Sequence, residues 1–553
     1  MPTSLQLTSL DAAYGARPLF QDLTLGVGPR DVVALVGPNG SGKSTLLRIV
    51  AGLHQAEGGS VDISPPGSTV GYLPQQAPLG GESLAAYARR RTGVTRAEQE
   101  LEAATAALVE QRPGADDGYA AAMERWLGLG GADLDHRLPE LAARIGLAVD
   151  LDRPLGSLSG GQAARACLLS VLASRFDLLL LDEPTNDLDA TGMALIRDYV
   201  TGLDAPVLVA SHDRGLIDDV ATTVVELDIR QARVGVYPGG WSDYEQARDL
   251  VRRASWEDYE RYADQRDALT EQARRRTDWA SKGARAARRS DEPDKHLRHR
   301  KVARAQAQDA RAAMTRRAVE RLEQVDQPRK EWELRYRVRE ADPSAAVVVG
   351  LTGAVVRRGG FTLGPVTVEV GRHDRIALVG DNGSGKSTLV AALLGRLPLD
   401  RGRRHEGTRV RWGLIDQQRS ELDVDTPVVD RVRDLLSIGA PAQEWPPDEV
   451  RTLLAKFGLG AEHITRPCST LSVGERTRAL LAVLQGHAVN TLVLDEPTNH
   501  LDVQAIEQLE QALAQFEGTV LLVTHDRPLT ERVGITRTWA LTAGALSEQS
   551  PTA

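Results

Sequence analysis

The stretch Gly37-Pro38-Asn39-Gly40-Ser41-Gly42-Lys43-Ser44-Thr45 matches the pattern G-x-x-x-x-G-K-[ST]. An apolar run, residues 32–36, precedes it, and residues 46–50 follow with apolar side chains at helical spacing. Strand, glycine-rich turn and helix in this order form a phosphate-binding loop, because main-chain N–H groups and the helix N-terminus converge on an anion. We expect Lys43 to reach the β- and γ-phosphates of a nucleotide and Ser44 to bind Mg²⁺.

The same pattern occurs a second time, as Gly380-Asp381-Asn382-Gly383-Ser384-Gly385-Lys386-Ser387-Thr388. It again follows an apolar run, residues 376–379. A glycine-rich turn that arises by chance is not expected twice in the same local context. The chain therefore contains two phosphate-binding loops.

The spacing between corresponding motifs locates an insertion in the first half. Lys43 and Lys386 lie 343 residues apart, whereas Asp182 and Asp495 lie only 313 apart. The first half therefore holds about thirty extra residues, within about 77–155, in a repeat of otherwise similar length. Their composition favours helix, which predicts a helical subdomain.

The whole-chain totals limit the class of protein. The 553 residues carry a net charge of −9, which argues against a generally basic nucleic-acid binder. Two isolated cysteines, Cys167 and Cys468, give neither a metal-ligand spacing nor a disulfide framework. The sequence has no signal peptide and no long apolar run, so we expect a soluble, cytoplasmic protein that could act at a membrane only through a partner.

The segment between the two halves differs in composition from both. Ser242-Asp243-Tyr244-Glu245 reads as a capping box that starts a helix, and two apolar stripes flank a break near Pro293. We therefore predict an α/β protein with a first domain over 1–240, a charged helical hairpin over 241–328 and a second domain over 329–553. Helices of about thirty residues would give an arm of about 45–50 Å.

The far end of the predicted hairpin reverses the charge of the chain. Residues 274–304 contain twelve basic and four acidic side chains. A solvated coiled-coil tip would explain such a run. A concentrated basic tip on an arm of an acidic protein fits contact with a phosphate backbone better.

Two acidic pairs follow apolar strands. Asp182 and Glu183 end the run 178–181, and Asp495 and Glu496 end its counterpart. A buried strand of a parallel sheet delivers such carboxylates to the edge that carries the phosphate loop. We expect Asp182 and Asp495 to hold Mg²⁺ through water, and Glu183 and Glu496 to orient the attacking water.

Two further kinds of residue recur in both halves. Gln75 and Gln417 are expected to sense Mg²⁺ and the attacking water. His212 and His525 each end another apolar strand. A single histidine of this kind is usually structural, but two at equivalent positions favour contact with the γ-phosphate.

The adenine side differs between the halves. Tyr14 lies 29 residues before Lys43, where its ring would stack on adenine. The equivalent position in the second half is Arg357, with Phe361 nearby, which argues against the same stacking there.

The pentapeptides Leu158-Ser159-Gly160-Gly161-Gln162 and Leu471-Ser472-Val473-Gly474-Glu475 complete the set. With them the chain resembles the ATP-binding cassette superfamily over nearly its whole length. The resemblance implies that the serine and glycines of one cassette close over the ATP of the other. One site would then combine Lys43 with Ser472, and the other Lys386 with Ser159. Val473 departs from the usual glycine and would alter the first site if that position required positive φ or close approach of the backbone.

Within the superfamily, two cassettes joined by a charged hairpin look like the ABC-F subfamily, and the stretches 182–189 and 495–502 are typical of it. The resemblance implies a monomer with paired cassettes that binds the ribosome. Its hairpin would reach rRNA and the P-site tRNA, to assist translation or to displace antibiotics. Two alternatives remain: the ATP-binding subunit of a drug exporter that works with a separate membrane protein, and a cassette ATPase of DNA repair.

Overall fold

A computed structural model describes most of the chain. The described residues are 2–15, 17–74, 81–147, 149–158, 160–185, 188–228, 233–289, 307, 313, 314, 317, 344–416, 419–439, 445–487, 489–499 and 501–549. They fall into two compact units, Met1–Asp243 with Glu333–Ala553, and Tyr244–Trp332.

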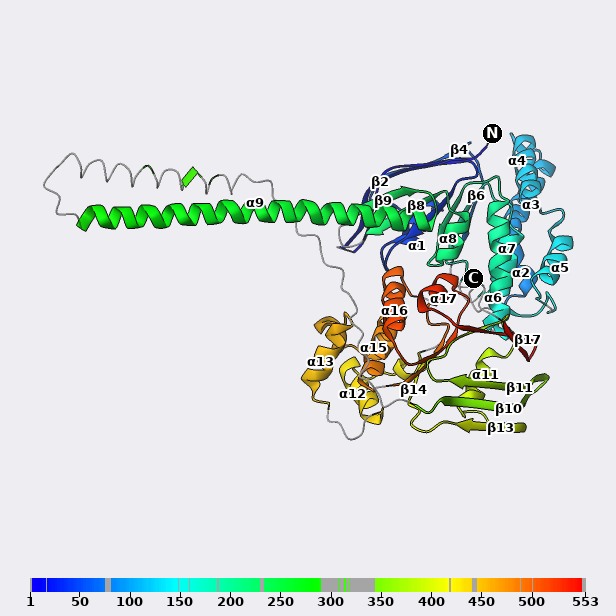
Figure 1. The fold of residues 1–553 in the computed structure, drawn as a ribbon. Helices are drawn as coiled ribbons and strands as arrows, with labels where there is room; N and C mark the ends of the chain where they lie inside the picture. Colours follow the sequence, from blue (N-terminus) through cyan, green and yellow to red (C-terminus); the bar gives the residue numbers. More distant parts are fainter. Residues whose placement is uncertain are drawn as a thin grey trace. The chain divides into compact units, whose positions relative to one another are not determined.

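The first cassette is built on a six-stranded sheet with the order β5-β6-β7-β3-β8-β9 (Figure 1). All neighbours pair in parallel except β8 and β9. Its strands are β3 (Val32–Val36), β5 (Val70–Leu73), β6 (Leu178–Asp182), β7 (Val207–Ala210), β8 (Thr223–Asp228) and β9 (Arg233–Pro238). The central strands are continuous apolar runs because both of their faces are buried.

A second, antiparallel sheet covers one side of this cassette. It has the order β2-β1-β4 and consists of β1 (Ser4–Tyr14), β2 (Arg17–Val27) and β4 (Gly58–Ser64). Helix α1 (Lys43–Val50) contributes Leu46 and Leu47 to the core that both sheets share. The helix that follows the phosphate loop is thereby fixed between two layers of strands.

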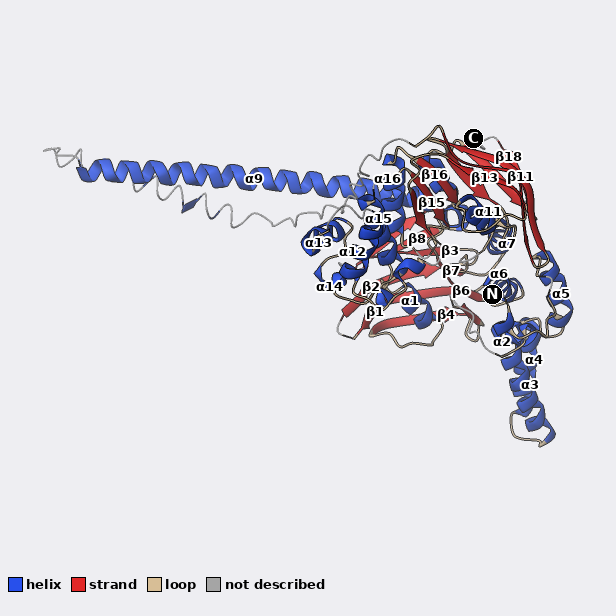
Figure 2. Ribbon diagram, turned by 90° about the horizontal axis from the view of Figure 1, so that it is seen from below, coloured by secondary structure: helices blue, strands red, loops and turns tan. Residues whose placement is uncertain are grey.

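The first cassette has seven further described helices, several of which lie beside the sheet (Figure 2). They are α2 (Leu84–Arg91), α3 (Val94–Val109), α4 (Ala115–Gly128), α5 (Leu134–Arg144), α6 (Gly160–Leu172), α7 (Ala190–Thr201) and α8 (Arg214–Val220), with a 3₁₀ turn at Leu155–Ser157. Helices α3 and α4 lie side by side and occupy the segment in which the insertion was expected.

The second cassette repeats this plan. Its main sheet has the order β14-β15-β16-β12-β17-β18, and its antiparallel sheet the order β11-β10-β13. The strands are β10 (Val347–Arg358), β11 (Phe361–Gly371), β12 (Arg375–Val379), β13 (Arg401–Glu406), β14 (Trp412–Ile415), β15 (Thr491–Asp495), β16 (Thr519–Val523), β17 (Arg537–Thr542) and β18 (Ala545–Gln549). The expected α/β fold with two cassettes is confirmed.

Apart from the insertion and the short helix Ala461–Ile464, the helices of the second cassette correspond to those of the first. They are α11 (Lys386–Leu393), α12 (Val428–Gly439), α13 (Pro447–Lys456), α14 (Ala461–Ile464), α15 (Val473–Gly486), α16 (Val503–Gln515) and α17 (Arg527–Val533), with 3₁₀ turns at Ser420–Leu422 and Cys468–Thr470. Helix α13 begins 313 residues after α5 begins, so α3 and α4 account for the extra length of the first cassette.

The long helix between the cassettes corrects two expectations. Helix α9 (Trp241–Arg289) has 49 residues, about 73 Å at 1.5 Å per residue, rather than about thirty. Arginine and alanine dominate its last part and favour helix, so the helix continues into the basic segment. It also starts before Ser242, whose hydroxyl donates to Asp218, while Asp243 accepts from the N–H of Gly240. The predicted break and most of the second hairpin helix lie outside the described residues.

The central strand β6 gives a test of the fold. Leu180 is fully buried in the first core. Truncation to alanine leaves a cavity between the two sheets, which costs about 2–5 kcal/mol. We expect Leu180→Ala to lower the midpoint of thermal unfolding by several degrees in calorimetry. The control Leu53→Ala, at a side chain that is 66% exposed, should leave it unchanged. Equal midpoints for the two variants would contradict this description of the core.

Candidate nucleotide-binding sites

The first phosphate loop lies between β3 and α1. Gly37 has φ 145°, and a Cβ there would lie 2.6 Å from the carbonyl oxygen of Leu227, so only glycine fits. The Nζ of Lys43 donates to the carbonyl oxygen of Gly37 at 2.8 Å. The hydroxyl of Ser41 is buried and has no hydrogen-bond partner among the described residues. The loop therefore presents unsatisfied donors in the geometry that binds phosphate.

Oxygen donors meet beside this loop. The Ser44 hydroxyl donates to Oδ1 of Asp182 at 3.1 Å, and the Tyr72 hydroxyl donates to Oδ2 at 3.1 Å. Asp182 ends β6, which lies one strand from β3 across β7. A hydroxyl and a carboxylate next to a phosphate site are the ligands that Mg²⁺ prefers, so these residues fit a magnesium ion.

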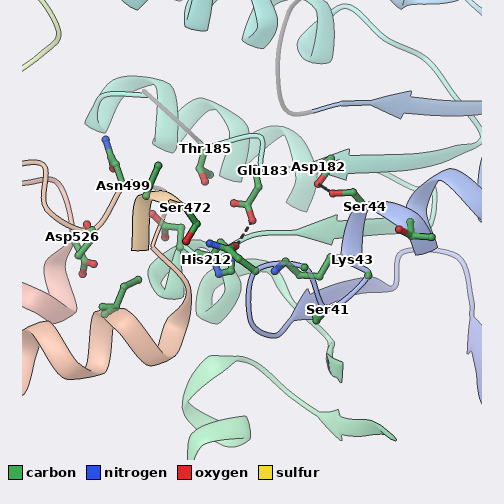
Figure 3. A pocket seen from close by; sticks show the side chains of 18 of the residues that line it. Ser41, Lys43, Ser44, Asp182, Glu183, Thr185, His212, Ser472, Asn499 and Asp526 are labelled. Atoms are coloured by element: carbon green, nitrogen blue, oxygen red, sulfur yellow. Dashed lines mark hydrogen bonds and ion pairs between the residues drawn. The ribbon is translucent and has the colours of Figure 1, made fainter. Parts of the chain in front are cut away.

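Glu183 occupies a constrained position next to Asp182. Its backbone has φ 50°, which is uncommon outside glycine, and its N–H donates to the carbonyl of Ala210 at 2.8 Å. Its Oε1 lies 3.1 Å from Nε2 of His212 (Figure 3). Burial raises the pKa of Glu183 to about 8, an effect that Lys43 opposes and Asp182 strengthens. Burial also lowers the pKa of Lys43. Each charged group therefore depends on a partner of opposite charge.

The second cassette completes this site. A cavity of about 780 Å³ is lined by the first phosphate loop, Glu183 and His212, and also by Ser472, Val473 and Asn499. Figure 3 shows Ser472 and Asn499 on the side of the cavity opposite Lys43. Ser472 caps α15 by accepting from the N–H of Glu475, whose side chain accepts in return from the N–H of Ser472. Tyr14, 82% exposed, lines the same cavity.

The valine in the second signature sequence causes no backbone strain. Val473 is the first residue of α15 and does not have positive φ. Positive φ, one of the two conditions under which Val473 would alter the first site, is therefore not met. Its side chain lines the cavity instead.

The site of the second cassette has the same chemistry in a smaller space. The Ser387 hydroxyl donates to Asp495 at 3.3 Å, and Nε2 of His525 lies 3.5 Å from Oε1 of Glu496. Glu496 repeats the unusual backbone of Glu183, with φ 45°. Burial and the neighbouring Lys386 lower the pKa of His525 to about 4. The cavity measures about 250 Å³.

Phe361, not Arg357, lines this smaller cavity, together with residues of the second phosphate loop. Of the remaining predicted site residues, Gln75, Gln417 and Ser159 lie outside the described residues. Gly160 and Gly161 begin α6, and Gly474 lies in the first turn of α15.

Two aspartates that the sequence analysis did not assign join the cassettes. Asp189 caps α7, and its Oδ2 accepts from the N–H of Asn382 at 3.1 Å in the opposite phosphate loop. Asp502 caps α16 and accepts from the N–H of Asn39 at 3.4 Å in the same way. The two aspartates end matching stretches of sequence and lie 313 residues apart, and this repetition is the signal from which they could have been found.

Arg419 is a third residue that the sequence did not reveal. Only 1% of it is exposed, and it has φ 50°. Its guanidinium donates to the hydroxyl of Thr477 and to the carbonyls of Pro497 and Asn499, at 3.0–3.3 Å. It thereby connects the loop after β14, helix α15 and the loop after β15. Its position in the first cassette holds Ala77, so no repeat pattern marked it.

Comparisons with known proteins agree with this arrangement. A family model described as ABC transporter matches residues 20–186 and 363–499. The tylosin resistance ATP-binding protein TlrC of Streptomyces fradiae is 32% identical over 551 residues, 96% of each chain. The energy-dependent translational throttle protein EttA of Mycobacterium tuberculosis is 30% identical over 94% of this chain and 88% of its own.

A solved complex of the archaeal ribosome recycling factor aABCE1 with the stalk protein aP1 shares the fold. Its TM-score is 0.56 with 19% identity, and the match covers 98% of this chain and 89% of that one. The two facing cassettes define an ATP-binding cassette protein. The chain belongs to the ATP-binding cassette family and, within it, to the ABC-F group. None of the described helices is long and apolar enough to cross a membrane.

The buried Arg419 gives a test of the segments that the second cassette contributes to the first site. In Arg419→Met, two buried carbonyls and one hydroxyl lose their donor, and each such loss costs about 1–3 kcal/mol. We expect a lower thermal midpoint and weaker ATP binding, measured by calorimetry. The exposed Arg411→Met is the matched control and should change neither. An Arg419→Met protein that matches the parent in both measurements would show that the three segments do not depend on Arg419.

Proposed function

We propose that the chain hydrolyses ATP at two composite sites and uses the ATP-bound state to act on the ribosome. The cavity that both cassettes line is the observation that supports ATP hydrolysis at composite sites. Lys43 and Glu183 of one cassette line it together with Ser472 of the other. A site completed by two domains binds its ligand most tightly when the domains are paired, so ATP would stabilise the pairing.

Each residue of the first site has a role in this proposal. Lys43 and the N–H groups of its loop bind the phosphates, and Ser44 and Asp182 hold Mg²⁺. The metal ion neutralises negative charge on the phosphates. Glu183, fixed by its backbone and by His212, orients the attacking water. Ser472, at the N-terminus of α15, closes the phosphate side from the other cassette.

The second site is proposed to work with the same groups at a different rate. Ser387, Asp495, Glu496 and His525 repeat the arrangement of the first site. The cavities differ in volume, and the first is lined by Tyr14 whereas the second is lined by Phe361. We therefore expect the single variants Glu183→Gln and Glu496→Gln to differ in residual turnover.

The ribosome is proposed as the partner on two grounds. The names of relatives that match nearly the full chain refer to a translational throttle and to tylosin resistance. The charge of residues 274–304, twelve basic against four acidic side chains, fits a phosphate backbone. The match to the resistance protein covers almost all of both chains, so resistance to an antibiotic is the activity to assay first.

Replacing both glutamates tests the catalytic assignment. The double variant Glu183→Gln/Glu496→Gln keeps the shape of each site but removes the carboxylate that handles water. We expect ATP turnover to fall by about 10²-fold or more, while ATP binding persists. The variant should then sediment with ribosomes in the presence of ATP.

Sedimentation with membrane vesicles instead would favour the exporter subunit. Near-normal turnover would contradict the assigned role of the glutamates. Lys43→Ala/Lys386→Ala, which should lose ATP binding itself, is the matched control for retention.

The salt dependence of binding tests the arm. If the basic tip contacts RNA, each lost phosphate contact lowers the slope of log K against log salt by about 0.7–0.9. We expect the quadruple variant Arg274→Gln/Arg288→Gln/Arg300→Gln/Lys301→Gln to bind ribosomes more weakly and with a slope reduced by about 3. Glutamine keeps helix propensity. Arg252→Gln/Arg253→Gln, near the start of α9, is the control. An unchanged slope in the folded quadruple variant would remove the arm from the interface.

A further inference from the structure

One buried ion pair crosses from the first cassette to the second. The Nη1 of Arg214, the first residue of α8, lies 2.9 Å from Oε1 and 3.2 Å from Oε2 of Glu510 on α16. Only 2% and 3% of the two side chains are exposed. A charge removed from water to this extent requires a partner. The pair is complete only while the cassettes are together.

The surroundings of Arg214 make this partner important. The guanidinium lies over the ring of Trp241, 5.5 Å from its centroid, and Trp241 is the first residue of α9. Its Nε and Nη2 have no hydrogen-bond partner among the described residues. Glu510 accepts a second bond from Arg532 of its own cassette, at 2.7 Å. Loss of Glu510 therefore leaves Arg214 without its hydrogen-bonded carboxylate, whereas loss of Arg214 leaves Glu510 paired with Arg532.

The repeat shows that this contact has no symmetric counterpart. At the offset of 313 residues, Glu510 corresponds to Arg197, and Arg532 corresponds to Asp219. Arg197 and Asp219 also form an ion pair within their cassette, at 3.2 Å, with the charges exchanged. Arg214 corresponds to Arg527. If the repeat formed the equivalent contact on the other side, Arg527 would face Arg197. Both side chains are cations and repel each other.

We propose that Arg214 and Glu510 are positioning residues that hold the two cassettes together at one point, so that the cassettes open and close asymmetrically about it. Arg214 lies two residues after His212, so the same contact fixes the loop that carries His212. It also joins the start of α9 to the junction between the cassettes through Trp241. The proposal deepens the proposed function because it rests on ATP-dependent pairing, but it does not require the ribosome.

Distances between spin labels on the two cassettes test this proposal. Labels at Leu53→Cys and Ile438→Cys, both strongly exposed positions, are placed in full-length Glu183→Gln/Glu496→Gln protein whose native cysteines are replaced by alanine. We expect Glu510→Gln to broaden the distance distribution without nucleotide. It should also raise the ATP concentration for half-maximal closure by about 10-fold or more, because a buried cation is left unpaired.

Further substitutions distinguish the loss of the ion pair between the cassettes from a disturbance within one cassette. Glu510→Gln and the double variant Arg214→Gln/Glu510→Gln both lack the ion pair, so we expect the double variant to lose no more closure than Glu510→Gln alone. Arg532→Gln, which breaks the bond to Glu510 within the second cassette, should leave closure unchanged. So should Arg197→Gln and Arg527→Gln at the corresponding positions. Thermal unfolding of each variant shows that the cassettes remain folded.

Additive effects of Arg214→Gln and Glu510→Gln would overturn the proposal, and so would equal effects of Arg197→Gln or Arg527→Gln. The distribution of distances between the two labels in the nucleotide-free protein depends neither on ATP hydrolysis nor on ribosomes. The result for the ion pair is therefore distinguishable from the result for the proposed function. A failure of the proposed function would appear in the protein with Glu183 and Glu496 restored, as normal closure without ATP turnover or ribosome binding.

Discussion

Both nucleotide sites depend on one constraint, namely that their reactive groups stand at the carboxyl ends of parallel strands buried on both faces. Strands β3, β7 and β6 are adjacent, and they end at the phosphate loop, at His212 and at Asp182 with Glu183. A shift of these apolar runs along the sheet would draw the polar residues at their ends into the core. The polar groups that follow them are therefore held in place by the core, and the site needs few contacts of its own.

Sequence reasoning was most successful where the chemistry follows such strands. The phosphate loops, the acidic pairs and the histidines could be placed because an apolar run and a repeat marked each one. Arg419 could not be predicted, because its partners are backbone carbonyls from distant loops and its counterpart is Ala77. The length of α9 was underestimated because apolar spacing alone does not show where a polar helix ends. The contacts of Asp189 and Asp502 needed the facing cassette, which sequence order does not supply.

The repeat is symmetric in its backbone and asymmetric in its charges. Asp189 and Asp502 accept hydrogen bonds from the opposite phosphate loops in matching ways, so each phosphate loop is in direct contact with the other cassette. Glu510 and Arg197 occupy equivalent positions with opposite charge, so the described residues form the buried ion pair on one side of the repeat and not on the other. An exchange of two charges within a duplicated domain is enough to make two similar sites behave differently, without any change in the fold.

The central claim is that each ATP is enclosed by both cassettes. A structure of the Glu183→Gln/Glu496→Gln protein with ATP and Mg²⁺ tests it most directly. The account predicts a nucleotide whose γ-phosphate lies between the N–H groups around Lys43 and the hydroxyl of Ser472, with Tyr14 against the adenine. A nucleotide held by Lys43 while Ser472 remains in contact only with its own cassette would contradict it.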